Sequence, residues 1–338
     1  MNELEQKIAG LLGELVEPKL KWKVGELNLI REVKLTGKAL YAKIELLTED
    51  TPLLDEFRHQ AAILVGPMGL DSFILDLEPA LVGRVGLEGV SHVVMIGSGK
   101  GGVGKSTIAV NLAVLAARRG FRVGLLDADL HGPSLPILMG SHQKPQVLEG
   151  ERLRPLDLHG VKCISIGSLV PPEKSLAWRG TLVSGTLLQL VHNTAWEELD
   201  LLFIDLPPGT GEVQLTLAQE LKTDGIALIS MPHELVLGDV RRAVSLYKEK
   251  HIPLIGLIEN MSGFVCPDCG KTQQIFSGAQ ADLGDFPILA KIPLDLALAE
   301  SANQGRPYIL DQELSPAAHA FGQILDQLVQ YVGLGAQG

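Results

Sequence analysis

The chain has 338 residues, a length that suits two domains or one large α/β domain. Hydrophobic residues make up 46% of it, so well-filled cores are expected and extensive disorder is not. The formal net charge of −11 argues against general electrostatic binding to nucleic acid or anionic lipid. Three cysteines are too few for a disulfide framework, and the sequence shows neither signal-peptide character nor an apolar run of the roughly 20 residues that span a bilayer. We therefore expect a cytoplasmic protein with no nucleic-acid partner and no stable membrane binding.

Residues 1–82 are predicted to form a small α/β domain. Apolar residues recur at helical spacing in the first segment, and Thr51 and Pro52 supply a cap and a first position for a later helix. The glycine-rich stretch 81–91 is the predicted linker to a second domain. The predicted elements are a helix at 1–16, a strand at 39–47, a helix at 51–66 and a strand at 71–79.

The second predicted domain, residues 91–333, consists of short apolar runs that alternate with helical stretches. Near-continuous apolar runs of this length are typical of strands covered on both faces by helices. The predicted strands are 92–96, 122–129, 161–167, 199–205, 225–230, 253–260 and 287–292. The fold class is therefore α/β, with a doubly wound, mostly parallel sheet of the P-loop NTPase kind that binds ligands outside the carboxyl ends of its strands.

The segment GSGKGGVGKST, residues 97–107, fits the phosphate-binding pattern G-x-x-x-x-G-K-[S/T]. It follows a predicted strand and opens a predicted helix, as the pattern requires; the alternative is a plain glycine-rich turn. Glycines let successive N–H groups face one anion, and the helix N-terminus adds partial positive charge. Lys105 is expected to reach the β- and γ-phosphates, Ser106 to bind Mg²⁺ and Thr107 to support the phosphates. The predicted ATP-binding loop comprises Gly99, Lys100, Gly101, Gly102, Val103, Gly104, Lys105, Ser106 and Thr107.

A second lysine, Lys100, lies inside this loop. The stretch KGGVGKST resembles that of the deviant Walker A ATPases, which include MinD, the ParA partitioning proteins, nitrogenase iron protein and the Mrp-type iron–sulfur carriers. In that group the early lysine reaches across a homodimer interface to the partner's nucleotide and neutralises charge during phosphoryl transfer. The resemblance implies the same catalytic role for Lys100, in the manner of an arginine finger. The alternative is a solvated lysine at a loop tip.

Three aspartates lie at predicted strand ends, where the sheet is expected to open onto the nucleotide. Asp127 and Asp129 alternate in direction if their strand continues, so they are expected to differ in role; the alternative is a capping or turn function. By resemblance to the same ATPases, Asp129 positions and activates the attacking water while Asp127 supports the Mg²⁺ shell. Asp205 ends an apolar strand, where a carboxylate can hold a Mg²⁺-bound water, and the loop LPPGTGE that follows can sense the γ-phosphate.

The nucleoside end of the site is predicted from fewer residues. The amide of Asn260 can both donate to and accept from adenine, and Pro293 and Leu294 can pack against the base. The ATPase group named above uses an asparagine and a proline-containing loop at these places. For Asn260 the alternative is a turn-forming residue.

Four longer stretches narrow the resemblance to the Mrp-type branch, also called ApbC or Nbp-related iron–sulfur cluster carriers. They are DADLHGPS (127–134), IDLPPGTGEVQLTL (204–217), GLIENMSGFVCPDCG (256–270) and AKIPLD (290–295). The first 82 residues are similar to an accessory domain often fused in front of these proteins, but Thr51 stands where that domain commonly has cysteine. Glu212, Thr181 and Leu182 also depart from the family pattern. The resemblance implies ATP hydrolysis coupled to cluster delivery, with assembly scaffold proteins and iron–sulfur apoproteins as partners.

Cys266 and Cys269 stand at C-x-x-C spacing in a knuckle-like turn rich in glycine and proline. A thioredoxin-like redox pair is one reading, but such a pair should precede a helix. A structural zinc normally needs four ligands, and the remaining cysteine, Cys163, lies in a predicted strand as a core thiol. A two-fold homodimer would supply four thiolates, which suit a [4Fe–4S] cluster or zinc equally on geometry. Resemblance to the Mrp-type carriers selects the cluster, bridged between subunits.

Two other functions stand as alternatives. One is a positioning ATPase of the MinD or ParA kind, which the acidic composition and the absence of Lys and Arg from the segment FGQILDQLVQYVGLGAQG oppose. The other is a protein with a structural zinc at the C-x-x-C pair. If that protein is a scaffold without ATPase activity, the phosphate loop and the strand-end carboxylates stay unexplained.

Overall fold

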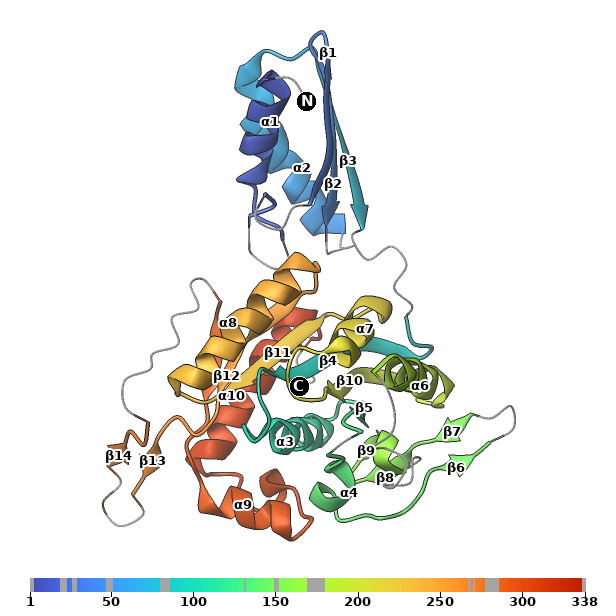
Figure 1. The fold of residues 1–338 in the computed structure, drawn as a ribbon, viewed down its shortest axis with the longest axis vertical. Helices are drawn as coiled ribbons and strands as arrows, with labels where there is room; N and C mark the ends of the chain where they lie inside the picture. Colours follow the sequence, from blue (N-terminus) through green and yellow to red (C-terminus); the bar gives the residue numbers. More distant parts are fainter. Residues whose placement is uncertain are drawn as a thin grey trace. The chain divides into compact units, whose positions relative to one another are not determined.

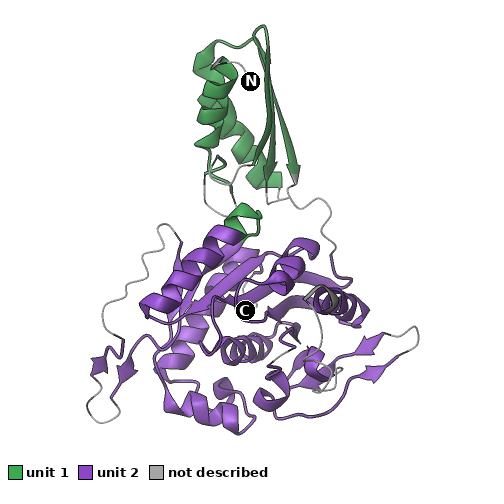
Figure 2. Ribbon diagram, in the orientation of Figure 1, with its two compact units in different colours: residues 1–84, 247–253 green, residues 85–246, 254–338 purple. Residues whose placement is uncertain are grey.

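The computed structural model describes residues 3–18, 23–25, 29–46, 51–79, 86–130, 132–148, 152–168, 180–266, 269, 271–276 and 286–335. The chain divides into two compact units, residues 1–84 with 247–253 and residues 85–246 with 254–338 (Figure 2). Residues 81–85 of the predicted linker 81–91 lie outside the described residues. Among the helices of the described part, none combines the length and the apolar character needed to cross a membrane.

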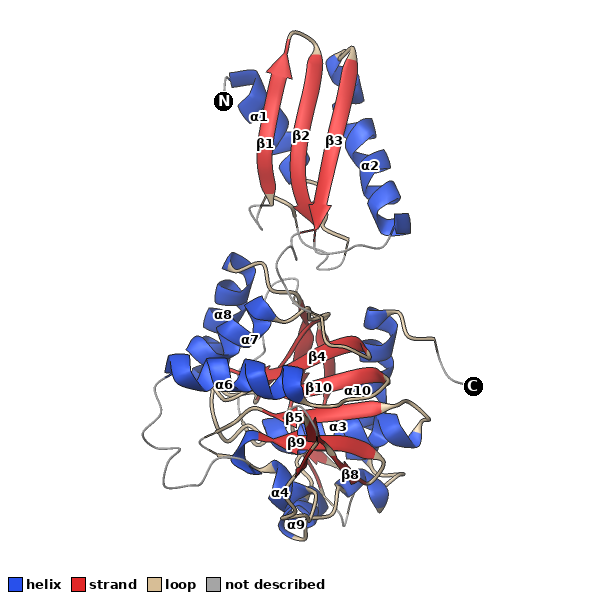
Figure 3. Cartoon of the chain, turned by 90° about the vertical axis from the view of Figure 1, so that its right-hand side faces the viewer, coloured by secondary structure: helices blue, strands red, loops and turns tan. Residues whose placement is uncertain are grey.

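The first unit is a three-stranded sheet with two helices packed on one face (Figure 3). The central strand β2 pairs antiparallel with β1 and parallel with β3. Its core joins Ile8 of α1, Ile44 of β2 and Phe57 of α2, which are buried. Strand β1 was not predicted, because Val33 is its only buried residue and its apolar pattern is therefore weak. The elements are α1 (Glu3–Gly13), β1 (Ile30–Thr36), β2 (Ala39–Leu46), α2 (Thr51–Val65), the 3₁₀ turn η1 (Gly66–Met68) and β3 (Ser72–Pro79).

The second unit is an eight-stranded sheet between helical layers (Figure 1). Its strands are β4 (Val90–Ser98), β5 (Val123–Asp127), β8 (Leu156–Leu158), β9 (Val161–Ser165), β10 (Leu199–Asp205), β11 (Gly225–Ser230), β12 (Leu254–Glu259) and β15 (Ile288–Lys291). Two further hairpins are β6 (Gln146–Val147) with β7 (Leu153–Arg154), and β13 (Phe264–Val265) with β14 (Thr272–Gln273). The helices are α3 (Lys105–Arg118), α4 (Leu135–Leu138), α6 (Gly180–Asn193), α7 (Glu212–Glu220), α8 (Glu234–Glu249), α9 (Leu296–Asn303) and α10 (Pro316–Val332), with 3₁₀ turns η3 (Ile166–Ser168) and η4 (Tyr308–Leu310).

The strand order is β15-β12-β11-β4-β10-β5-β9-β8, parallel throughout except for the antiparallel edge strand β8. Helices α6, α7 and α8 lie on one side of the sheet, and α3 and α10 on the other (Figure 3). Every residue of β5, β11 and β12 is buried, which explains their continuous apolar sequences. The predicted fold class is confirmed: the chain holds a doubly wound, mostly parallel α/β sheet.

The site lies at the point where the strand order of the sheet reverses direction. From β4 the chain passes to β5 on one side, and it later returns to β11 on the other side of β4. Helices on opposite faces then diverge at the carboxyl end of β4, which opens a crevice there. The loop 97–107 occupies this crevice between β4 and α3.

Candidate functional site

The phosphate loop has the geometry of an anion cradle. Gly102 and Gly104 have φ angles of 79° and 86°, in the left-handed region that glycine adopts without strain. Helix α3 begins directly afterwards at Lys105, so its free N–H groups point back toward the loop. A cavity of about 290 Å³ opens beside it. Its lining combines residues of the loop with Asp129, Gly132, Ser134, Leu138 and Pro208 from other segments.

Lys105 is engaged by a carboxylate. Its Nζ lies 2.5 Å from Oδ1 of Asp205 at the end of β10, and both side chains are almost fully buried. The same ammonium donates to the Ser106 hydroxyl at 3.3 Å. Because the Lys105 ammonium is already shielded from water, binding a phosphate does not require a further loss of hydration. Its contact with Asp205 can be replaced in part by contacts with phosphate oxygens.

Asp127 and Asp205 lie side by side. They are register partners on the parallel strands β5 and β10. Burial, together with the neighbouring charge of Asp205, raises the pKa of Asp127 to about 7. Burial also raises the pKa of Asp205, although Lys105 opposes the shift. Two crowded buried carboxylates and one ammonium leave this cluster short of positive charge, which favours a divalent cation with oxygen ligands.

Asp127 and Asp129 have different surroundings. The Asp127 carboxylate accepts N–H groups from Asp129, Ser134 and Leu135 and the hydroxyl of Ser165, at 3.0 to 3.2 Å. It therefore fixes the loop that follows β5. Asp129 is half-buried, accepts the Gly132 N–H at 3.1 Å and lines the cavity. The strand ends at Asp127 rather than at the predicted residue 129, because the loop turns onto the Asp127 carboxylate.

Two polar residues were not predicted, one that lines the cavity and one that braces the loop beside it. The hydroxyl oxygen of Ser134 is buried and has no hydrogen-bond partner among the described residues, although Ser134 lines the cavity. An unpaired buried hydroxyl is costly, so this oxygen is suited to a ligand. The buried Gln214 donates to the carbonyls of Pro207 and Pro208 at 3.0 and 2.8 Å and braces the loop after β10. The sequence GEVQLTL, residues 211–217, does not reveal the two hydrogen bonds that Gln214 makes.

The predicted adenine residues are placed differently from the phosphate loop residues. Asn260 is buried and donates from Nδ2 to the carbonyl of Val103 at 2.8 Å, so its amide braces the phosphate loop. A Cβ at Gly104 would stand 2.5 Å from this nitrogen. Pro293 and Leu294 are half-buried, and the Leu294 N–H donates to the Gly263 carbonyl at 2.7 Å. The described lining of the 290 Å³ cavity contains none of Asn260, Pro293 and Leu294.

Lys100 lies at the exposed edge of the cavity. Its Nζ is 2.9 Å from Oδ2 of Asp239 in α8 and 3.5 Å from the Leu235 carbonyl. The Ser98 hydroxyl donates to the Lys100 carbonyl at 2.8 Å and fixes the backbone at this position. The side chain is 45% exposed, so it is accessible to a second molecule.

The C-x-x-C pair lies in the hairpin β13–β14, where strand β14 rather than a helix follows it. Cys266 is half-buried and its N–H donates to the Lys271 carbonyl at 3.0 Å, while Cys269 is exposed. Cys163 is fully buried in β9, where burial raises the pKa of its thiol well above the usual range. No group of three or more His, Cys, Asp or Glu residues with metal-binding geometry occurs in the described part of the chain. A single subunit therefore offers two accessible thiols.

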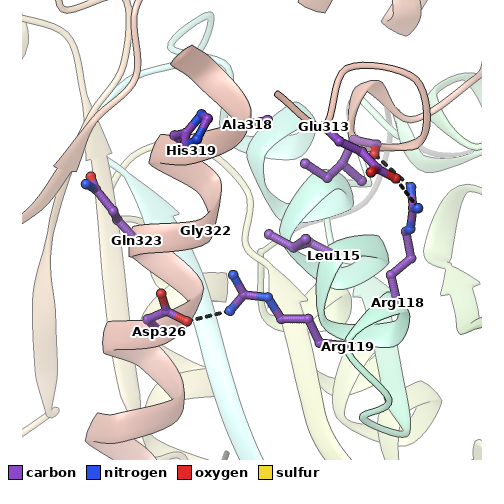
Figure 4. A pocket seen from close by; sticks show the side chains of 10 residues that line it. Leu115, Arg118, Arg119, Glu313, Ala318, His319, Gly322, Gln323 and Asp326 are labelled. Carbon is purple, nitrogen blue, oxygen red and sulfur yellow. Dashed lines mark hydrogen bonds and ion pairs between the residues drawn. The ribbon is translucent and has the colours of Figure 1, made fainter. Parts of the chain in front are cut away.

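A larger cavity of about 490 Å³ lies between α3 and α10 (Figure 4). Arg118 pairs there with Glu313 and donates to the Ile309 carbonyl, and Arg119 pairs with Asp326. Both guanidinium groups are thus neutralised by carboxylates of the same chain. Their contacts join α3 to the C-terminal segments.

Comparisons with known proteins show which family this chain resembles. Residues 89–329 match the family model ParA, described as NUBPL iron-transfer P-loop NTPase. The iron–sulfur cluster carrier protein of Deinococcus radiodurans is 39% identical over 332 residues, which cover 96% of this chain and 94% of the relative. The iron–sulfur cluster carrier protein of Escherichia coli K12 is 32% identical over 338 residues, covering 96% and 91%.

Solved structures show the same fold. A nucleotide-binding protein of Archaeoglobus fulgidus in complex with ADP has a TM-score of 0.59 and 35% identity, and covers 71% of this chain and 95% of its own. MinD of Pyrococcus horikoshii, complexed with Mg-ADP, has a TM-score of 0.58 and 22% identity over 73% of this chain and 99% of its own. The family model spans well over half of the chain, and the chain therefore belongs to the ParA family of NUBPL-type iron-transfer P-loop NTPases.

Proposed function

We propose that the protein is an ATP-hydrolysing carrier that holds an iron–sulfur cluster between two subunits and delivers it to apoproteins. The observation that carries the proposal is the presence, in one compact unit, of a phosphate cradle and an accessible cysteine pair. The relatives from Deinococcus and Escherichia carry the name iron–sulfur cluster carrier protein and match nearly the whole chain, which supports the cluster over zinc as cargo. Assembly scaffold proteins would supply the cluster, in the cytoplasm.

The nucleotide would bind with its phosphates on residues 99–107. The related Archaeoglobus protein was solved with ADP, which supports a nucleotide in this cradle. The carboxylates of Asp127 and Asp205 and the hydroxyl of Ser106 form an oxygen donor set, and the raised pKa of Asp127 fits a site that gains from a cation. These residues would hold Mg²⁺ directly or through water, and the ion would neutralise charge on the phosphates.

Hydrolysis would use residues of both subunits. Asp129 is half-buried at the cavity, where it can orient a water toward the γ-phosphate. Lys100 is the exposed cation of the loop and would reach the nucleotide of the partner subunit, where it stabilises charge in the transition state. The brace between Gln214 and the Pro207–Pro208 carbonyls would keep the loop after β10 in position to respond to the γ-phosphate.

The cluster would be cargo bound by the hairpin β13–β14. Two-fold symmetry brings Cys266 and Cys269 of each subunit to one axis and supplies four thiolates, which a [4Fe–4S] cluster requires. Because Cys269 is exposed, the cluster would lie near solvent and would be transferable. Residues 1–82 are proposed as an accessory domain for docking, without thiol chemistry of its own.

The test is anaerobic reconstitution of the full chain with iron and sulfide. We expect about four iron and four sulfide per dimer and transfer of the cluster to an apoprotein. A protein that takes up one zinc per dimer and no iron under these conditions would contradict the carrier function. Tight binding to anionic vesicles or duplex DNA at physiological salt would instead support a positioning ATPase.

Replacement of Lys100 by Ala is expected to lower the turnover of ATP by about 10³-fold while ATP affinity changes little, because a charge delivered in trans acts on the transition state. Turnover at saturating ATP and the equilibrium affinity for a non-hydrolysable analogue separate the two effects. Unchanged turnover would remove the trans role of Lys100. Replacement of Lys162, a partly exposed, ion-paired lysine of β9 that lies outside the cavity lining, serves as the matched control.

A further inference from the structure

We propose that Asp239 is a positioning residue for Lys100, and that the first two turns of α8 connect this lysine to the cysteine hairpin. The inference rests on the carrier function proposed above and names the residues through which nucleotide and hairpin would influence each other. All of them lie in one compact unit, residues 85–246 with 254–338. Lys100 then has two alternative partners, Asp239 of its own chain and the nucleotide of the partner subunit.

The contact between Lys100 and Asp239 is suited to exchange. The two charged atoms are 2.9 Å apart, and the buried Oδ2 has no hydrogen-bond partner besides this ion pair among the described residues. Arg242 lies 3.3 Å from the other oxygen of Asp239, so this half-buried carboxylate keeps a cation when Lys100 leaves. Departure of Lys100 does not strand an unpaired charge, which would be the main cost of breaking such a pair.

The phosphate loop and α8 also touch through their backbones. A Cβ added at Gly99 would stand 2.9 Å from both the carbonyl carbon and the Cβ of Asp239. No side chain fits between the two segments, so a shift of the loop at Gly99 and Lys100 must displace α8 or be resisted by it. The position of Lys100 and the position of the first turns of α8 are therefore mechanically linked.

The start of α8 reaches the cysteine hairpin by a ring contact. The ring of His233, just before Glu234, meets the ring of Phe276 edge-on with centroids 6.0 Å apart. His233 Nδ1 also accepts the Leu235 N–H at 3.3 Å, which ties the ring to the first turn of the helix. Phe276 follows β14, and β14 pairs with the strand β13 that leads into Cys266. A displacement of α8 is thus passed to the hairpin that would hold the cluster.

The first test measures thiol exposure and needs no cluster. Alkylation rates of Cys266 and Cys269 are followed by mass spectrometry, with and without a non-hydrolysable ATP analogue, and the buried Cys163 serves as an internal unreactive control. In the wild-type protein we expect the analogue to change these rates about two- to fivefold, the range expected from exchange of one partly exposed ion pair. Asp239→Asn removes the charge and keeps the shape, so this variant should show the analogue-bound rates without analogue. If the analogue leaves the alkylation rates of the wild-type protein unchanged, the inference is overturned.

The second test separates positioning from a structural role of Asp239. Asp239→Asn should raise ATP turnover about two- to fivefold with an unchanged KM, because Lys100 is released for the partner. The double variant Lys100→Ala/Asp239→Asn should turn over ATP no faster than Lys100→Ala alone, because the effect passes through Lys100. A merely structural Asp239 would lower turnover in both backgrounds, and that result would overturn the proposal.

The third test breaks the ring contact from either side. His233→Asn keeps a side-chain acceptor at the start of α8 and removes the ring, while Phe276→Leu removes the other ring. Both variants should hydrolyse ATP at the wild-type rate and lose the effect of the analogue on cysteine alkylation. Retention of that effect in both variants would overturn the link to the hairpin. Cluster loading by the wild-type protein is measured separately from cysteine alkylation and ATP turnover. A protein that takes up no cluster would therefore contradict the carrier function without changing the results of these three tests.

Discussion

Replacement of Lys105 by Ala is expected to abolish ATP binding at micromolar nucleotide. The ammonium is buried at the cavity and would form charge-assisted contacts with two phosphates, each worth about 1.5–3 kcal/mol. Their combined loss, roughly 3 kcal/mol or more, weakens binding by a factor of about 100 or more. Equilibrium binding of a fluorescent ATP analogue measures the effect. Affinity within about threefold of wild type would remove Lys105 from the phosphate site.

The same substitution has a second consequence that must be separated from the first. Without Lys105, the buried carboxylate of Asp205 loses its ion-pair partner, which costs about 3–5 kcal/mol of folding free energy. The pKa of Asp205, already raised by burial, would rise further. The folded state would then hold a proton that the unfolded state has released, so the stability of the variant falls as pH rises above about 4. Thermal unfolding followed between pH 5 and 8 should show this slope.

The double variant Lys105→Ala/Asp205→Asn is the matched control. An amide in place of the carboxylate needs no buried counter-ion, so most of the lost stability should return and its dependence on pH should flatten. ATP binding should stay absent, because the phosphates still lack their cation. Recovery of binding together with stability would mean that Lys105 acts only as the partner of Asp205.

The sheet could be predicted because its strands are buried on both faces. Strands β5, β11 and β12 are wholly buried, so each reads as an uninterrupted apolar run. The same logic fails where burial is partial. Strand β1 buries Val33 alone, and the hairpin β13–β14 has strands of two residues, too short for a periodic pattern.

Within the site, local geometry could be predicted and long-range pairing could not. The phosphate loop follows from glycine spacing between a strand and a helix, because its shape depends on neighbouring residues. The ion pair of Lys100 with Asp239 joins residues far apart in sequence, and the hydrogen bond from Asn260 to Val103 spans 157 positions. Such contacts depend on how α8 and β12 pack beside the loop. Asn260 has the amide expected of an adenine contact, yet the structure uses its N–H to brace the loop.

The double variant Cys266→Ser/Cys269→Ser is expected to lose the cluster. Serine nearly preserves the size of cysteine but is a poor ligand for iron, so iron should fall from about four per dimer to background after anaerobic reconstitution. Iron and sulfide counting and the visible absorption of the cluster measure the loss. Neither cysteine is among the described residues that line the cavity, so ATP affinity should be unchanged.

Cys163→Ala provides the control for this experiment. Cys163 is buried in the sheet, and the raised pKa of its thiol opposes the thiolate form that binds metal. This variant should keep the full cluster, although loss of a buried side chain lowers its stability. A double serine variant that retained four iron per dimer would place the cluster elsewhere and remove the hairpin from the proposal. Loss of iron with retained ATP binding would instead separate the two functions into two sites of one compact unit, with the cradle at β4 binding nucleotide and the hairpin β13–β14 binding cargo.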